Sequence, residues 1–192
     1  MASLIAEYGP PADVLARRGR APTSAYGALL RSIVGQQLSA KAARTIFERL
    51  LELFGGRAPT SRELLDSDPD RLREAGLSRA KVAYLRDLAE HVEDGELDLD
   101  GLPELPDEEV AAELVRVKGL GEWTAHMFLI FHLGRPDVLP VGDLGIRRAV
   151  QVQYGLAELP APGELERIAE PWRPHRSLAC LYLWRSLDNA PA

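Results

Sequence analysis

A glycine-rich turn between two helix-forming segments is the part of the sequence best suited to bind phosphate. The segment L-V-R-V-K-G-L-G-E-W-T-A-H-M-F-L-I, residues 114–130, places Gly119 and Gly121 at the turn. Glycine permits left-handed backbone angles and a close approach of another backbone. The amides that open the second helix, from Glu122, would point outward and attract a phosphate oxygen. Such a turn can hold a DNA backbone without reading its sequence. The alternative is a tight corner between helices whose glycines serve only packing.

One carboxylate and two tryptophans are the other side chains that could take part in a reaction or bind a ligand. Asp143 stands in L-P-V-G-D-L-G-I-R-R, residues 139–148, where it could cap a helix running to Tyr154. Trp123 and Trp184 could pack in a core or present an aromatic face to a ligand. His126 and His132 are six residues apart, which puts them on different helix faces and disfavours a joint metal site.

Composition limits the class of protein. The 192 residues include 23 basic and 29 acidic side chains, a net charge of −6, and one cysteine. A single cysteine excludes a disulfide framework, a four-cysteine zinc site and an iron–sulfur cluster held by cysteines. No apolar run reaches membrane-spanning length and no signal pattern opens the chain, so we expect a soluble, cytoplasmic protein, nucleoid-associated if bacterial.

The distribution of charge weakens the objection that an acidic protein should avoid nucleic acid. Residues 93–115 contain ten acids and no Lys or Arg, and the rest of the chain is mildly basic. Glycine and proline interrupt this acidic segment, and much of it is therefore predicted to be a solvated connector. We expect it to lie away from any DNA-binding face.

The elements that must position these residues are helices almost throughout. Ala43, Ile46, Phe47, Leu50 and Leu51 follow helical spacing from Ser39. Capping signals predict further starts at Thr60, Asp68 and Ser78. Apolar stripes predict the remaining helices, and no convincing strand pattern occurs; the predicted helices include 107–117, 122–133, 143–154 and 175–187. Cys180 lies in an apolar helix and reads as a small buried residue.

Five ordered motifs together resemble the helix-hairpin-helix DNA glycosylase superfamily, and in particular its AlkA-like, DNA-3-methyladenine glycosylase II branch. Besides the hairpin and the Asp143 segment, they are residues 32–39 (S-I-V-G-Q-Q-L-S), 76–89 and 171–185. The resemblance covers roughly residues 24–188. It implies an all-α, two-lobed fold with the active-site cleft between the lobes. One lobe would comprise residues 25–134, including the helix-hairpin-helix at about 107–133, and the other residues 1–24 plus 135–192.

The resemblance also implies the reaction and its catalytic residue. Asp143 occupies the position of the catalytic aspartate, where a carboxylate near C1′ would stabilise positive charge on the sugar and orient a water. Trp123 and Trp184 would line the pocket, since aromatic faces attract electron-poor alkylated purines. Trp123 stands where bifunctional members carry a lysine, which implies a monofunctional enzyme. Met127 replaces a pocket tyrosine of some relatives and makes the pocket less aromatic.

Further positions correspond to the family's DNA contacts. Residues 35–38 would form the wedge that fills the gap left by a flipped base, with either Gln37 or Leu38 inserted and Gln36 beside them. The hairpin contributes the other expected DNA-binding residues, which are Lys118, Gly119, Leu120, Gly121 and Thr124. Arginines are expected phosphate partners at positions 147, 148, 173 and 176. The family often binds Na⁺ or K⁺ through hairpin carbonyls, here those of Val117 and Leu120, without a required cofactor.

The sequence therefore predicts a monomeric enzyme of base excision repair that flips alkylated purines out of double-stranded DNA and hydrolyses their N-glycosidic bond. The substrates would be of the 3-methyladenine and 7-methylguanine type. Two alternatives remain open at this point. One is a glycosylase for another purine, such as ethenoadenine or hypoxanthine. The other is a non-catalytic helix-hairpin-helix module that binds DNA, against which the Asp143 segment and the tryptophans speak.

Overall fold

A computed structural model describes residues 1–12 and 24–188, and within them the ordered secondary structure is helical, without strands. This confirms the predicted all-α class. The chain divides into two compact units, one from residues 1–20 and 129–192 and the other from residues 21–128. Within the described part of the chain, no helix is long and apolar enough to cross a membrane.

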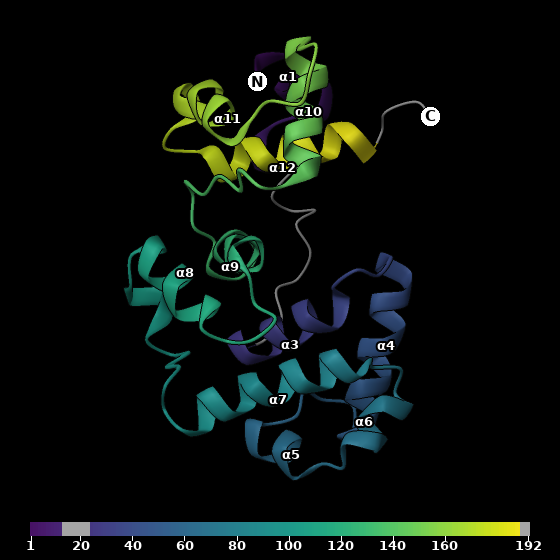
Figure 1. The fold of residues 1–192 in the computed structure, drawn as a ribbon. Coiled ribbons are helices and arrows are strands. Elements are labelled where there is room, and N and C mark those ends of the chain that lie inside the picture. The colour runs from purple at the N-terminus through teal and green to yellow at the C-terminus, as the bar shows by residue number, and fades with distance from the viewer. Residues whose placement is uncertain (13–23, 189–192) are drawn as a thin grey trace. The chain divides into compact units, whose positions relative to one another are not determined.

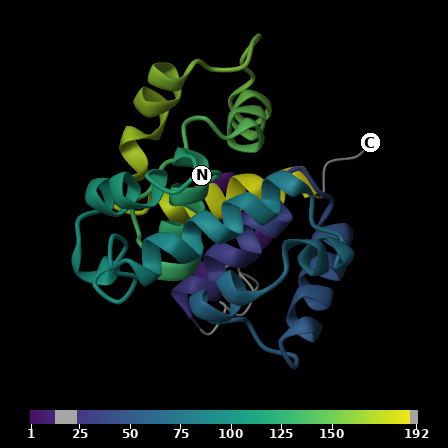
Figure 2. The same cartoon turned by 60° about the horizontal axis from the view of Figure 1, so that its bottom comes forward.

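The unit of residues 21–128 is built around a long central helix. Its helices are α3 (Ala25–Gly35), α4 (Ala40–Leu53), α5 (Ser61–Asp66), α6 (Pro69–Glu74), α7 (Arg79–Glu93), η1 (Leu102–Glu104), α8 (Asp107–Val115) and α9 (Glu122–Phe128). Helix α7 packs against α3, α5 and α6, and Figures 1 and 2 both show it running beside α3. Its apolar stripe is buried through Val82, Leu85 and Leu88, which makes this helix the core of the unit.

Local capping chemistry sets the helix starts in this unit. Thr60 and Glu63 form the predicted capping box at α5, and Asp68 caps α6 with Pro69 in its first turn. Ser78 accepts the amide of Lys81 at the start of α7, as predicted. Ser39 does the same for α4. Helix α3, by contrast, was not recognised as an element from the sequence.

The unit that joins the chain ends is organised by its last helix. It contains α1 (Ala2–Tyr8), η2 (Leu129–Leu133), α10 (Leu144–Tyr154), α11 (Pro162–Ala169), η3 (Glu170–Trp172) and α12 (Arg176–Asp188). Helix α12 packs against both α10 and α1. It buries Cys180, Tyr182 and Leu183, and the Tyr182 hydroxyl donates to the Gly9 carbonyl at 2.8 Å. Cys180 is therefore the buried small residue that its apolar helix predicted.

The segment 122–133 departs from the single helix that its apolar run predicts. Helix α9 ends at Phe128, and Leu129–Leu133 forms a π-helical turn, η2. The two units also divide between Phe128 and Leu129. An apolar run fixes burial but not the number of residues per turn, so periodicity could not show this widened turn.

Candidate functional site

Asp143 is held at the N-terminus of α10 by two donors on the same oxygen. Its Oδ1 accepts the amide of Ile146 at 2.7 Å and the indole Nε1–H of Trp184 at 3.0 Å. The carboxylate is 9% exposed. The predicted helix cap is therefore present, and α12 adds a second anchor through its tryptophan. A carboxylate held in this way has a fixed orientation and keeps its charge near the positive end of the helix dipole.

Trp184 is positioned by an aromatic neighbour and a glycine. Its ring stacks on Phe131 with centroids 5.7 Å apart. A Cβ on Gly145 would lie 3.2 Å from Cδ1 and 3.3 Å from Nε1 of Trp184, and 3.0 Å from Asp143 Oδ1. The indole thus lies directly over the first turn of α10. Sequence reasoning found Trp184 but missed Phe131 and Gly145, because no spacing in the chain links them to it.

The loop that leads to Asp143 is fastened to the start of α12. Arg176 donates from Nε to Asp137 Oδ1 at 2.7 Å and from Nη2 to the Asp137 carbonyl at 2.7 Å, and Arg173 Nη1 reaches Asp137 Oδ2 at 2.8 Å. Ser177 accepts the Val138 amide at 2.9 Å. Burial alone would raise the pKa of Asp137, but the two arginines outweigh it and hold that pKa below its ordinary value.

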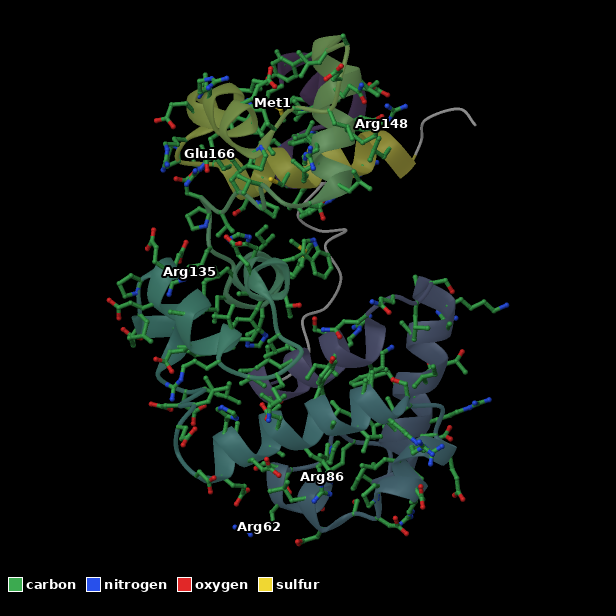
Figure 3. All side chains as sticks on the ribbon, viewed as in Figure 1. Met1, Arg62, Arg86, Arg135, Arg148 and Glu166 are labelled. Carbon is green, nitrogen blue, oxygen red and sulfur yellow. The ribbon has the colours of Figure 1, made fainter. Side chains whose placement is uncertain are left out.

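The predicted arginine contacts with phosphate change in light of these bonds. Arg173 and Arg176 are engaged with Asp137, so their first role is to hold the loop. Arg147 donates to the Pro160 carbonyl at 2.9 Å. Arg148 is exposed on α10, where Figure 3 labels it, and bonds only a neighbouring glutamine side chain. Unlike the other three arginines, Arg148 is bonded neither to a carboxylate nor to a main-chain carbonyl among these bonds.

The hairpin between α8 and α9 is closed by a turn that requires its first glycine. The Leu120 amide donates to the Val117 carbonyl at 3.1 Å, and Gly119 has φ 85°. A Cβ on Gly119 would overlap the ring of Tyr84, whereas a Cβ on Gly121 would meet nothing within 4 Å. Gly119 thus serves packing inside the protein, and Gly121 keeps the outer side of the turn open. The packing interpretation therefore applies at Gly119, and the phosphate contact near Gly121 stays a prediction.

Lys118 is exposed, but it is also bonded to a carboxylate of α7. Asp87 accepts the Lys118 amide at Oδ2 and its ammonium at Oδ1, each at 2.8 Å. Burial opposes ionisation of Asp87, yet these bonds hold its pKa below the ordinary value, and they raise the pKa of Lys118. The predicted phosphate contact of Lys118 would therefore compete with Asp87.

The predicted wedge loop splits into inward and outward residues. Gln36 Nε2 donates to the Gly119 carbonyl at 2.6 Å, so the predicted DNA contact of this partly buried side chain would compete with that bond. Gln37 has φ 58°, the single positive value outside glycine among the described residues, and its side chain is exposed. Leu38 is 37% exposed. Either of these two outward residues can reach a ligand.

The remaining predicted site residues lie on α9 or just before it, and they differ in exposure. Trp123 is 48% exposed, Met127 is half-buried, and Thr124 and Leu120 are both 4% exposed. The side chains of Thr124 and Leu120 thus point into the unit, which limits their predicted DNA contacts to the backbone. Trp123 belongs to the unit of residues 21–128, and Trp184 and Asp143 to the other. Their joint pocket stays a prediction.

Comparisons with known proteins identify the family of the chain. The family model described as HhH-GPD superfamily base excision DNA repair protein matches residues 30–174. A Schizosaccharomyces pombe protein named DNA-3-methyladenine glycosylase 1 is 33% identical over 97% of this chain and 80% of its own length. A Bacillus subtilis relative, YfjP, also named for DNA-3-methyladenine glycosylase, is 32% identical over 86% of this chain; the matched part spans 60% of that relative.

A solved structure extends the comparison to the fold. The S. pombe 3-methyladenine DNA glycosylase Mag1 in complex with abasic DNA superposes with a TM-score of 0.83 at 32% identity, covering 98% of this chain and 90% of that one. The family match spans well over half of the chain, and it confirms the resemblance predicted from the five motifs. The chain belongs to the HhH-GPD superfamily of base excision DNA repair proteins.

Proposed function

We propose that this protein is a monofunctional DNA glycosylase that hydrolyses the N-glycosidic bond of alkylated purines, of the 3-methyladenine and 7-methylguanine type, in double-stranded DNA. The names of its relatives bear out an enzyme of the DNA-3-methyladenine glycosylase kind. We propose which alkylated bases are excised, and we propose that the enzyme is monofunctional. The cleft between the two units and the monomeric state are also part of the proposal.

The geometry of Asp143 is the single observation that carries this proposal. Departure of the base leaves positive charge on the sugar, and a fixed carboxylate stabilises it and orients the attacking water. The two N–H donors on Oδ1 already restrict the rotation of the Asp143 carboxylate. Little further conformational entropy is therefore lost when the transition state forms. An alkylated purine is already a good leaving group, so the site has little need of a general acid.

Base recognition would rest on aromatic faces, with Trp123, Trp184 and Met127 lining the pocket. An electron-poor or cationic purine is attracted to the face of an indole. Trp123 also stands at the position of the lysine used by bifunctional relatives, which supports hydrolysis without a Schiff base. Trp184 would serve twice, since the indole that orients Asp143 also offers a face.

The hairpin would hold the DNA backbone through its amides near Gly121, and Gln37 or Leu38 would fill the space of the flipped base. We also propose that the Val117 and Leu120 carbonyls hold a monovalent cation. Backbone carbonyls are suitable hard donors, and the Val117 oxygen that accepts the Leu120 amide keeps a second lone pair. A rise in melting temperature in KCl over choline chloride, at equal ionic strength, would support this cation site.

The decisive experiment incubates the protein with methylated duplex DNA and measures released bases and heat-labile abasic sites. We expect 3-methyladenine and 7-methylguanine to be released, and Asp143→Asn to lower the rate at least about 100-fold. Leu144→Ala, a change at an exposed neighbour, serves as a control for folding. Release of ethenoadenine or hypoxanthine alone would contradict the substrate assignment. Covalent trapping on DNA by borohydride would contradict the monofunctional mechanism.

A further inference from the structure

One side of α7 contacts both of the loops that we assign to DNA. Lys81, Tyr84 and Asp87 succeed one another at intervals of three residues, which makes them neighbours on the helix surface. We call these three residues the α7 brace. Each of them contacts either the wedge loop, residues 35–38, or the hairpin turn, residues 117–121.

The first contact of the α7 brace fixes the base of the wedge loop. Lys81 Nζ donates to the Val34 carbonyl at 2.7 Å and to the Gln36 carbonyl at 2.8 Å. These carbonyls lie at the C-terminal end of α3, where backbone acceptors lack helical partners and the helix dipole favours a cation. An ammonium at this point holds the end of α3 just before the exposed Gln37.

The other two contacts fix the hairpin turn. The Tyr84 ring occupies the space beside Gly119 that a side chain would need. Asp87, 6% exposed, accepts both the amide and the ammonium of Lys118 at 2.8 Å. A buried carboxylate with two charge-assisted bonds is costly to displace. The turn is therefore held on its inner side, away from its open side at Gly121.

A direct bond closes the connection between the two loops. Gln36 Nε2 donates to the Gly119 carbonyl at 2.6 Å, although the two residues are 83 positions apart. Three links therefore close a ring of contacts. Lys81 joins α7 to the wedge loop, the bond from Gln36 joins the wedge loop to the hairpin turn, and Asp87 joins the hairpin turn to α7. Gln37, held in a left-handed conformation that costs a non-glycine residue energy, sits at the exposed tip of the ring.

We propose that the α7 brace holds the wedge loop and the hairpin turn as one mechanical unit, so that backbone binding and insertion into the duplex occur at a fixed spacing. Lys81, Asp87 and Gln36 are positioning residues in this scheme. The role in DNA rests on the proposed function, whereas the mechanical coupling belongs to the free protein.

The coupling is tested first by amide hydrogen exchange without DNA, in Gln36→Leu and Lys81→Met. We expect Gln36→Leu to accelerate exchange about tenfold in both loops and not in residues 61–74, because local opening of one loop releases the other. Lys41→Met removes the same charge as Lys81→Met from an exposed position on α4 and should change neither loop. Faster exchange confined to the wedge loop in Gln36→Leu would overturn the proposal.

The consequence for DNA is tested with Lys81→Met, which removes the ammonium that bonds the Val34 and Gln36 carbonyls. We expect its affinity for a duplex with an abasic site, where the wedge can insert, to fall about tenfold, and its affinity for undamaged duplex to fall less than twofold. An equal loss for both duplexes would show a merely structural role. Failure to excise alkylated bases would reject the proposed function, while the exchange result would stand.

Discussion

Replacing Gly145 with alanine would disturb Asp143, the proposed catalytic carboxylate, through its neighbour Trp184. The added methyl carbon would lie 3.0 Å from Asp143 Oδ1 and 3.3 Å from Trp184 Nε1. Relief of these contacts by a few tenths of an ångström on each side would stretch the bond from Nε1 to Oδ1, now 3.0 Å, to the limit of hydrogen bonding. A hydrogen bond to a charged group contributes about 1.5–3 kcal/mol, so we expect the excision rate to fall about 10- to 100-fold.

Stability should change less than activity, because the weakened hydrogen bond to Asp143 and the gain in helix propensity from alanine oppose each other. Gly145 lies in the first turn of α10 without a positive φ, and alanine there favours the helix by about 0.5–1 kcal/mol. Single-turnover release of 7-methylguanine and urea unfolding would measure the two effects separately. Gly163→Ala is the matched control, because Gly163 has the corresponding place in α11 and its Cβ would meet nothing within 4 Å. Wild-type turnover in Gly145→Ala, or a loss of turnover that parallels a loss of stability, would refute the reasoning.

Substitutions at Gly119 and Gly121 separate the packing role of the hairpin turn from DNA contact, and a substitution at Asp137 tests the loop that leads to Asp143. Gly119→Ala should destabilise the protein by about 2 kcal/mol or more in urea unfolding, since it combines a positive φ with overlap on Tyr84. Gly121→Ala should leave stability unchanged but weaken DNA binding measured by fluorescence anisotropy; unchanged binding would place the backbone contact elsewhere. The lowered pKa of Asp137 contributes stability that is present above its ordinary pKa of 3.8 and is lost as the pH falls through the lowered value. In Asp137→Asn, the free energy of unfolding should therefore depend less on pH at acidic pH. An unchanged pH dependence would count against the pairing of Asp137 with Arg173 and Arg176.

Sequence reasoning succeeded where structure depends on neighbours in the chain. The cap at Asp143 and the capping box at Thr60 each involve residues three positions apart, so the pattern alone identifies them. The widened turn at Leu129–Leu133 could not be found this way. A π-helical turn differs from an α-helix in that its hydrogen bonds reach one residue further along the chain, and its apolar composition is the same.

The candidate site shows the limit for distant contacts. The sequence predicts Lys118 and Arg176 as phosphate partners, yet each is bound by an acid more than 30 residues away. Gln36 reaches Gly119 over a still longer interval. No spacing rule links such pairs, since tertiary packing alone brings them together. The residue types were informative, but their partners had to come from the structure.

The acidic charge of the protein predicts how its DNA binding should respond to salt. Lys118 and Arg116, the bases next to the hairpin, are paired with Asp87 and Glu113. If the hairpin binds phosphate through amides instead, few condensed cations are released on binding. Six to ten Lys or Arg contacts would give a slope of log K against log salt of about −5 to −9, and we expect one shallower than about −3. A steep slope in anisotropy titrations would show that these bases leave their acidic partners to bind DNA, because the amides alone could not produce it.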